Sequence, residues 1–313
     1  MKQLVVALLL ALSAATAWAD ASSACRQNLL GRLECDYLTL SVGSPARELR
    51  YQLPSGPTPT NGWPVALLFH GTGGLIVWSS APTSTGAGTF GSYYQMQTLR
   101  DLLDQGYAVL APPASNVTTG WQTNNMSACP SGGCTENKGP TASQYPGTAD
   151  DLFFQALFAV IADSRAATEQ QPASGLGAKL DSSRMYAAGI SSGGYNSSRM
   201  AINYTARFRA LAIQSASYAN CSGPGCVVPA LPTDHPPTLF LHGAGDDIVP
   251  LATMLPYPAL LASKAYTVID YTKGSKLLGD TRCDAGSQAN CKVGHQWIQA
   301  APVEILNWFN GHP

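Results

Sequence analysis

The stretch RMYAAGISSGGYNSSRM, residues 184–200, decides the fold. Its first seven residues are typical of a buried strand, and a helix is predicted from Gly194 to about Tyr204. Between them lies Gly189-Ile190-Ser191-Ser192-Gly193, which matches the pattern G-x-S-x-G. In that pattern the serine lies on a sharp turn, and a side chain at either glycine would collide with the chain. The sequence therefore predicts a strand, a tight turn carrying Ser191, and a helix.

The same alternation of strand and helix continues on both sides of this turn. Strands are predicted over residues 65–69, 107–111, 208–214, 238–242 and 265–271, and helices over 93–105, 148–165 and 301–309. Residues 37–53 precede them as a predicted antiparallel hairpin. Such alternation favours one α/β domain with a mostly parallel sheet and helices on both faces. Ligands of such sheets bind beyond the carboxyl ends of the strands, where Ser191 is expected.

Ser191 is a candidate nucleophile, because a serine hydroxyl on such a turn can be activated by a histidine. In the α/β-hydrolase fold the chain order is serine, then an acid, then histidine. Only His295 and His312 come late enough in the chain, and His312 is the penultimate residue. We therefore predict His295, just before the last helix, as the general base.

The acid is expected on the loop after a late strand. His242-Gly243-Ala244-Gly245-Asp246-Asp247-Ile248-Val249-Pro250 follows such a strand, and both aspartates are candidates. Asp246 fits H-G-x-x-D-x-x-V-P better than Asp247, which would then be a solvated loop residue. His242 precedes the acid and is interpreted as structural.

A second turn is expected to stabilise the oxyanion of the reaction. His70-Gly71-Thr72-Gly73-Gly74 follows the first strand of the alternating region. Acyl transfer in this fold uses the backbone N–H after the nucleophile and one from this turn. We predict Ser192 and Thr72 as the donors, with Gly73 in reserve.

The N-terminus and the cysteines indicate an exported protein. Residues 1–19 carry Lys2, an apolar run and Ala17-Trp18-Ala19, which is typical of a secretory signal peptide and not of a membrane span. The mature domain would then comprise residues 20–313. The eight cysteines follow in four local pairs that predict disulfides: Cys25 with Cys35, Cys129 with Cys134, Cys221 with Cys226, and Cys283 with Cys291.

The composition argues against several other classes of protein. The net charge is −1 and only 12% of residues are charged, with no basic cluster to favour a nucleic-acid partner. The cysteine spacings lack the CxxC pattern and histidines of metal sites, so no metal is expected. No cofactor is implied either.

Several segments resemble those of extracellular medium-chain-length polyhydroxyalkanoate depolymerases. The resemblance rests on GISSGGYNSSRMAINYTARFRALAIQSASYANCS (189–222), DHPPTLFLHGAGDDIVP (234–250), GHQW (294–297) and the terminal WFNGHP. It implies a secreted α/β-hydrolase that cleaves the ester bonds of a water-insoluble polyester. The family's nucleophile, acid and base then fall on Ser191, Asp246 and His295. The turn HGTGG looks more like that of ordinary esterases.

Three alternatives stay open at this point. One is another secreted carboxylesterase, such as a feruloyl-type esterase or a hydrolase of short-chain or aromatic polyesters. A second is a noncatalytic binding protein on the same scaffold, and a third is a peptidase. If the substrate is a solid polymer, Trp78, Tyr93, Tyr94, Trp121 and Tyr218 are candidates for contact with it, or else core residues.

Overall fold

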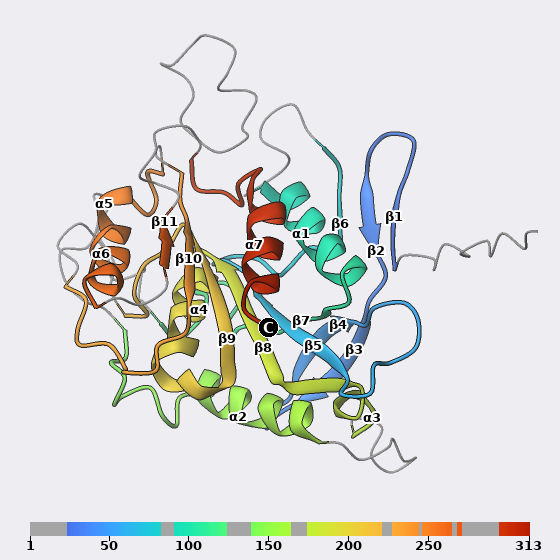
Figure 1. The fold of residues 1–313 in the computed structure, drawn as a ribbon, viewed down its shortest axis with the longest axis horizontal. Helices are drawn as coiled ribbons and strands as arrows, with labels where there is room; N and C mark the ends of the chain where they lie inside the picture. The colour runs from blue at the N-terminus through green and yellow to red at the C-terminus, as the bar shows by residue number, and fades with distance from the viewer. Residues whose placement is uncertain are drawn as a thin grey trace, which may run out of the picture.

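A computed structural model gives the fold of the chain (Figure 1). It describes residues 24–82, 91–123, 139–163, 174–220, 227–243, 246–264, 268–270 and 294–313. Within these residues the main sheet has eight strands in the order β11-β10-β9-β8-β5-β7-β4-β3. Their bounds are β3 Leu38–Val42, β4 Arg47–Gln52, β5 Trp63–Phe69, β7 Ala108–Ala111, β8 Leu180–Ile190, β9 Phe208–Gln214, β10 Thr238–Leu241 and β11 Val268–Asp270.

Along the sheet from β7 through β5, β8, β9 and β10 to β11, neighbouring strands pair in parallel. Strand β4 pairs antiparallel with β7, and β3 pairs antiparallel with β4. The predicted mostly parallel sheet and the predicted first hairpin are therefore confirmed. Strand β5 pairs with β7 on one side and with β8 on the other, so the order of the strands reverses there. Such a reversal opens a crevice at the carboxyl ends of the strands, which is where Ser191 follows β8.

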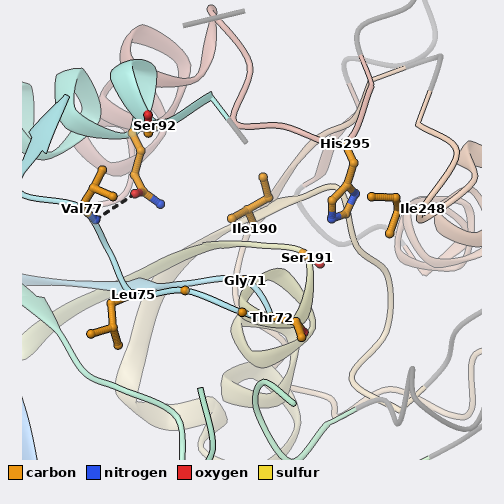
Figure 2. Close-up of a pocket in the computed structure, with 12 residues that line it drawn as sticks. Gly71, Thr72, Leu75, Val77, Ser92, Ile190, Ser191, Ile248 and His295 are labelled. Carbon is orange, nitrogen blue, oxygen red and sulfur yellow. Dashed lines mark hydrogen bonds between the residues drawn. The ribbon is translucent and has the colours of Figure 1, made fainter. Parts of the chain in front are cut away.

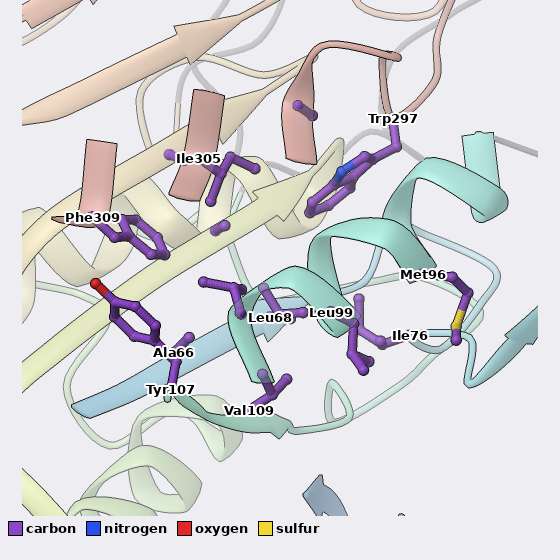
Figure 3. Packing of buried hydrophobic residues seen from close by; sticks show 14 of the residues in the cluster. Ala66, Leu68, Ile76, Met96, Leu99, Tyr107, Val109, Trp297, Ile305 and Phe309 are labelled. Carbon is purple, nitrogen blue, oxygen red and sulfur yellow. The ribbon is translucent and has the colours of Figure 1, made fainter. Parts of the chain in front are cut away.

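Helices cover both faces of this sheet (Figure 1). Helices α1 (Ser92–Asp104) and α7 (Ala301–Asn310) pack on one face against Ala66 and Leu68 of β5. Figure 3 shows this cluster, in which Leu99, Ile305 and Phe309 come from the two helices. Successive strand residues point to opposite faces, so Leu67 and Phe69 face helices α2 (Ala149–Ala162) and α4 (Ser192–Asn203) instead.

The remaining elements are short. Their bounds are α3 Ser174–Gly177, a 3-10 helix Thr205–Arg207, α5 Leu251–Met254 and α6 Pro256–Ser263. Residues 251–263 form two short helices and not one, because Pro256 begins the second.

A small second sheet, which includes the first two strands of the described chain, lies beside α1. It joins β1 (Cys25–Gln27), β2 (Leu33–Cys35) and β6 (Ser79–Ser80) in antiparallel pairs, and it is not among the strands predicted from the sequence. A disulfide links Cys25 and Cys35 across β1 and β2. The other three expected cysteine pairs, and the expected signal peptide, lie outside the described residues.

Among the described residues, no helix is long and apolar enough to cross a lipid bilayer.

Candidate active site

Ser191 lies at the tip of the turn between β8 and α4, as the pattern G-x-S-x-G predicts. Its φ of 56° and ψ of −127° lie in a region that few residues other than glycine adopt. The Ser191 N–H donates to the carbonyl of Gln214 at 3.0 Å, which fixes the turn to the end of β9. The strained backbone is therefore held in place by the neighbouring strand.

Close packing explains the glycines on either side of the nucleophile candidate. A Cβ on Gly189 would meet the carbonyl group of Gly193, and one on Gly193 would meet the carbonyl of Phe69. The helix can therefore start against β5 only because these positions lack side chains. This packing brings Ser191 next to the turn that follows β5.

His295 and Asp246 come together although 49 residues separate them. The Nδ1 atom of His295 lies 2.8 Å from Oδ2 of Asp246. Because an ionised carboxylate only accepts hydrogen bonds, Nδ1 carries the proton, and the other ring nitrogen, Nε2, is the one that can act as a base. In Figure 2 the ring of His295 points toward Ser191, and both residues line the same pocket.

The carboxylate of Asp246 is buried and held from two sides. Its Oδ1 accepts from the backbone N–H groups of Ile248 at 3.0 Å and Val249 at 2.8 Å. Burial alone would raise the pKa of Asp246, but the hydrogen bond and charge of His295 and the bond from Val249 outweigh it and lower that pKa. Asp246 is therefore ionised at neutral pH.

His242 also faces this carboxylate. Its Nε2 donates to the carbonyl of Val249 at 2.8 Å and lies 3.5 Å from Oδ2 of Asp246. His242 thus packs against the loop of the acid, which agrees with its interpretation as a structural residue.

The loop of His295 is anchored to the core two residues further on. Trp297 is fully buried, and its indole N–H donates to Oγ1 of Thr98 in α1 at 2.9 Å. The carbonyl of Gln296 accepts from the Gln214 side chain at 3.3 Å. Through these contacts α1 and the end of β9 set the position of the histidine.

The turn after β5 is held by a buried histidine. His70 is only 1% exposed, its Nδ1 donates to the carbonyl of Gly71 at 2.7 Å, and its Nε2 accepts from the N–H of Ala114 at 2.9 Å. Burial lowers the pKa of His70, in agreement with this neutral form. Gly73 donates its N–H to the carbonyl of Val117 at 2.7 Å, so the donor held in reserve is already used within the fold.

Residues 113–123 form a support for this turn that sequence reasoning missed. The indole N–H of Trp121 donates to the carbonyl of His70 at 3.0 Å. Gly120, with a φ of 83°, passes so close that a Cβ there would lie 2.5 Å from Oγ of Ser192 and 2.7 Å from Oγ1 of Thr72. In the sequence this segment begins a long stretch without clear periodicity, residues 113–146, and such stretches are often functional loops.

Asp150 in the first turn of α2 holds this support loop. Its carboxylate accepts from the N–H groups of Ser115 at 2.9 Å and Gln122 at 2.6 Å, and it forms an ion pair with Arg47 at 2.6 Å. An aspartate suits the first turn of a helix because of the helix dipole, but the carboxylate of Asp150 also fixes a loop that lies about 30 residues away in the sequence.

A pocket of about 520 Å³ opens in front of Ser191. Residues 71–75 and Val77 form one wall of this pocket, and Ser92 and Gln95 of α1 line it beside them. Ile190, Ile248 and His295 complete the lining, so most of the surface is apolar. Figure 2 shows Leu75, Val77, Ile190 and Ile248 around this space. A mostly apolar cavity with a few polar groups is typical of a small-molecule site.

The structure places the less favoured candidates, Asp247 and His312, away from this contact. Asp247 is exposed, whereas Asp246 contacts His295. His312 lies at the end of α7, where its Nδ1 donates to the carbonyl of Trp308 at 2.7 Å. Within the described part of the chain, no group of three or more His, Cys, Asp or Glu side chains is arranged to hold a metal ion.

The aromatic residues considered for contact with a polymer lie mainly in the core. Trp78, Trp121 and Tyr218 are at most 5% exposed, and Tyr93 and Tyr94 are half-buried. Trp121 stacks on Phe154 of α2. None of the five is fully exposed, so the core interpretation is the better one for them.

Two comparisons with known proteins agree with this architecture. The chain is 40% identical over 272 residues to a poly(3-hydroxyoctanoate) depolymerase of Pseudomonas fluorescens, covering 85% of this chain and 80% of that protein. The crystal structure of a Bacillus cereus carboxylesterase superposes with a TM-score of 0.50 at 14% identity, over 85% of this chain and 95% of that one. This second likeness concerns the fold alone. No family model matches the chain.

The first match extends over most of both proteins, and the second agrees with the observed fold. The chain is therefore an ester hydrolase with the α/β-hydrolase fold, and it belongs to the family of the Pseudomonas fluorescens poly(3-hydroxyoctanoate) depolymerase.

Proposed function

We propose that this chain is an exported enzyme that hydrolyses a water-insoluble polyester, in particular a polyhydroxyalkanoate with medium-length side chains. The observation that carries the proposal is the 40% identity to a poly(3-hydroxyoctanoate) depolymerase over most of both chains. The apolar pocket in front of Ser191 supports it, because alkyl side chains favour such a lining.

Ser191, His295 and Asp246 are proposed to act together through an acyl-enzyme. Nε2 of His295 takes the hydroxyl proton while Oγ of Ser191 bonds to the ester carbonyl carbon. The carbon–oxygen bond to the leaving unit then breaks, and His295 gives its proton to that oxygen. Water, activated by the same nitrogen, hydrolyses the acyl-enzyme. Asp246 stabilises the imidazolium ion through the 2.8 Å hydrogen bond.

The oxyanion of the tetrahedral intermediate is assigned to two backbone N–H groups. Ser192 begins α4, so its N–H points out of the helix and the helix dipole favours negative charge there. Thr72 lines the pocket beside it, while the next N–H, that of Gly73, is engaged by Val117. Thr72 is therefore the better second donor.

Contact with the polymer is assigned to aliphatic residues at the rim. Leu75 is 38% exposed and Ile248 is 50% exposed, and both line the pocket. They offer an apolar surface directly at the nucleophile, which a solid polyester can cover.

Export is proposed on the basis of the N-terminal residues and the cysteines. Residues 1–19 would be removed as a signal peptide, leaving residues 20–313 as one domain. The disulfide between Cys25 and Cys35 supports an oxidising compartment.

Clearing of polyester latexes by the purified mature protein tests the function. We expect poly(3-hydroxyoctanoate) latex to clear and poly(3-hydroxybutyrate) latex to stay turbid, with Ser191→Ala inactive on both. If neither latex clears while small esters are hydrolysed through Ser191, the chain is a small-ester carboxylesterase and the polymer proposal is wrong.

A further inference from the structure

One wall of the pocket carries a polar side chain with no role in the reaction described above. Gln95 lies in the second turn of α1 and is only 7% exposed. It lines the same cavity as Ser191, together with the apolar residues Val77 and Ile190. A buried amide in an apolar wall costs free energy unless its hydrogen bonds are made, so its presence calls for a partner.

The orientation of this amide is fixed by the neighbouring backbone. The N–H of Val77 donates to Oε1 of Gln95 at 3.2 Å, a bond drawn as a dashed line in Figure 2. Because an N–H group needs an acceptor, the oxygen of the amide must face Val77 and the NH₂ group must face away from it. Among the described residues, none accepts a hydrogen bond from this NH₂ group.

The NH₂ group is also not sealed inside the protein. Gln95 keeps 7% of its surface exposed and lines the pocket, so the NH₂ group that faces away from Val77 is open to the pocket. The pocket therefore presents a neutral, pre-oriented pair of N–H donors at a distance from Ser191. Such a donor selects an oxygen acceptor on a bound molecule, and it has no charge with which to select an ion.

We infer that Gln95 is a specificity-determining residue that donates a hydrogen bond to the ester carbonyl of a second repeat unit, next to the scissile one. The inference rests on the proposed polyester hydrolysis. A polyester has a carbonyl in every unit, whereas a simple monoester has only the one that reacts at Ser191. Gln95 would therefore favour oligoesters over monoesters of similar apolar character.

Two isosteric variants test this role with two soluble substrates. Gln95→Glu keeps an oxygen for the N–H of Val77 and loses the donor, and Gln95→Met loses both functions. The substrates are the linear trimer of 3-hydroxyoctanoate and ethyl octanoate, and kcat/KM is measured for each by chromatography of the released acids. Gln52→Glu is the matched control. Gln52 lies in strand β4, outside the pocket, and its Oε1 also accepts a hydrogen bond from a backbone N–H, that of Leu53.

We expect the trimer-to-monoester ratio of kcat/KM to fall about tenfold in both Gln95 variants, the usual effect of one lost hydrogen bond. The ratio should stay unchanged in Gln52→Glu. An equal loss on both substrates, or an unchanged ratio, would overturn the role of Gln95 while leaving polyester hydrolysis intact. If one variant fails to fold, the other decides alone. A wild-type protein that cleaves ethyl octanoate but not the trimer would instead refute the polyester proposal, and the inference with it.

Discussion

Replacing Gly120 by alanine tests whether residues 113–123 hold the two oxyanion donors in place. At Gly120 the φ of 83° costs an alanine about 1–2 kcal/mol. The added Cβ would also lie 2.5 Å from Oγ and 2.9 Å from Cβ of Ser192, and 2.7 Å from Oγ1 of Thr72. Because the Cβ of Ser192 cannot rotate away, the loop or the start of α4 must shift.

A shift at this point moves a donor away from the oxyanion. Losing one such donor typically lowers kcat about 10²–10³-fold, so we expect Gly120→Ala to lose about 10²-fold in kcat on p-nitrophenyl octanoate. Its melting temperature should fall by several degrees, because about 1 kcal/mol corresponds to about 2–4 °C in a chain of this size.

Gly106→Ala is the matched control for backbone strain. Gly106 has a φ of 86°, and a Cβ there would meet nothing within 4 Å. This variant should lose thermal stability through backbone strain alone, hence less than Gly120→Ala, and keep its kcat. If the two variants show the same kcat, the contact of Gly120 with Ser192 and Thr72 does not position the donors, and the reasoning is wrong.

Two further predictions concern charge at the site and in the core. Asp246→Asn should lower kcat on p-nitrophenyl octanoate about 10³–10⁴-fold, because an amide does not enforce the tautomer of His295. Asp247→Asn should change kcat less than threefold. Equal losses of kcat in the two variants would contradict the assignment of Asp246 as the acid. Burial lowers the pKa of His235 from 6.5 to about 4. The unfolded chain therefore takes up this proton first, and the free energy of unfolding should fall by up to about 3 kcal/mol between pH 6.5 and pH 4. Urea unfolding at both pH values should show a smaller fall in His235→Gln, and an unchanged fall would refute the role of His235.

Local rules were enough to predict the nucleophile turn and the helices around it. Gly189 and Gly193 flank Ser191 in a pattern whose spacing itself requires a tight turn, and the structure has that turn. Thr148 is a typical capping residue at the start of the helix predicted over 148–165, and its side chain accepts from the N–H of Asp151. In these cases the interacting residues are neighbours in the sequence, so the sequence pattern is enough to predict their contact.

The chain order of serine, acid and histidine predicted which segments supply the acid and the base. It did not predict which of two adjacent aspartates would contact the histidine. The order rule left Asp246 and Asp247 open, and the distinction depends on the path of a loop whose Val249 N–H binds the carboxylate. The catalytic roles of these residues remain predictions that the proposed variants test.

The support of the oxyanion turn could not be predicted from the sequence. His70 meets Ala114 and Trp121 across more than 40 residues, and Asp150 meets Arg47 across about 100. Residues 113–123 have no periodicity from which their direction could be inferred, and nothing local reveals that Trp121 is buried. Such contacts depend on the strand order, which places β7 beside β5.

The most direct test of the central claim is to locate the residue that a fluorophosphonate labels. The purified protein would be treated with the reagent, digested, and the adduct mapped by mass spectrometry within the peptide that contains both Ser191 and Ser192. The account predicts a single adduct on Ser191 that disappears in Ser191→Ala and is strongly slowed in His295→Ala. An adduct on Ser192, or no labelling of a protein that hydrolyses esters, would contradict it.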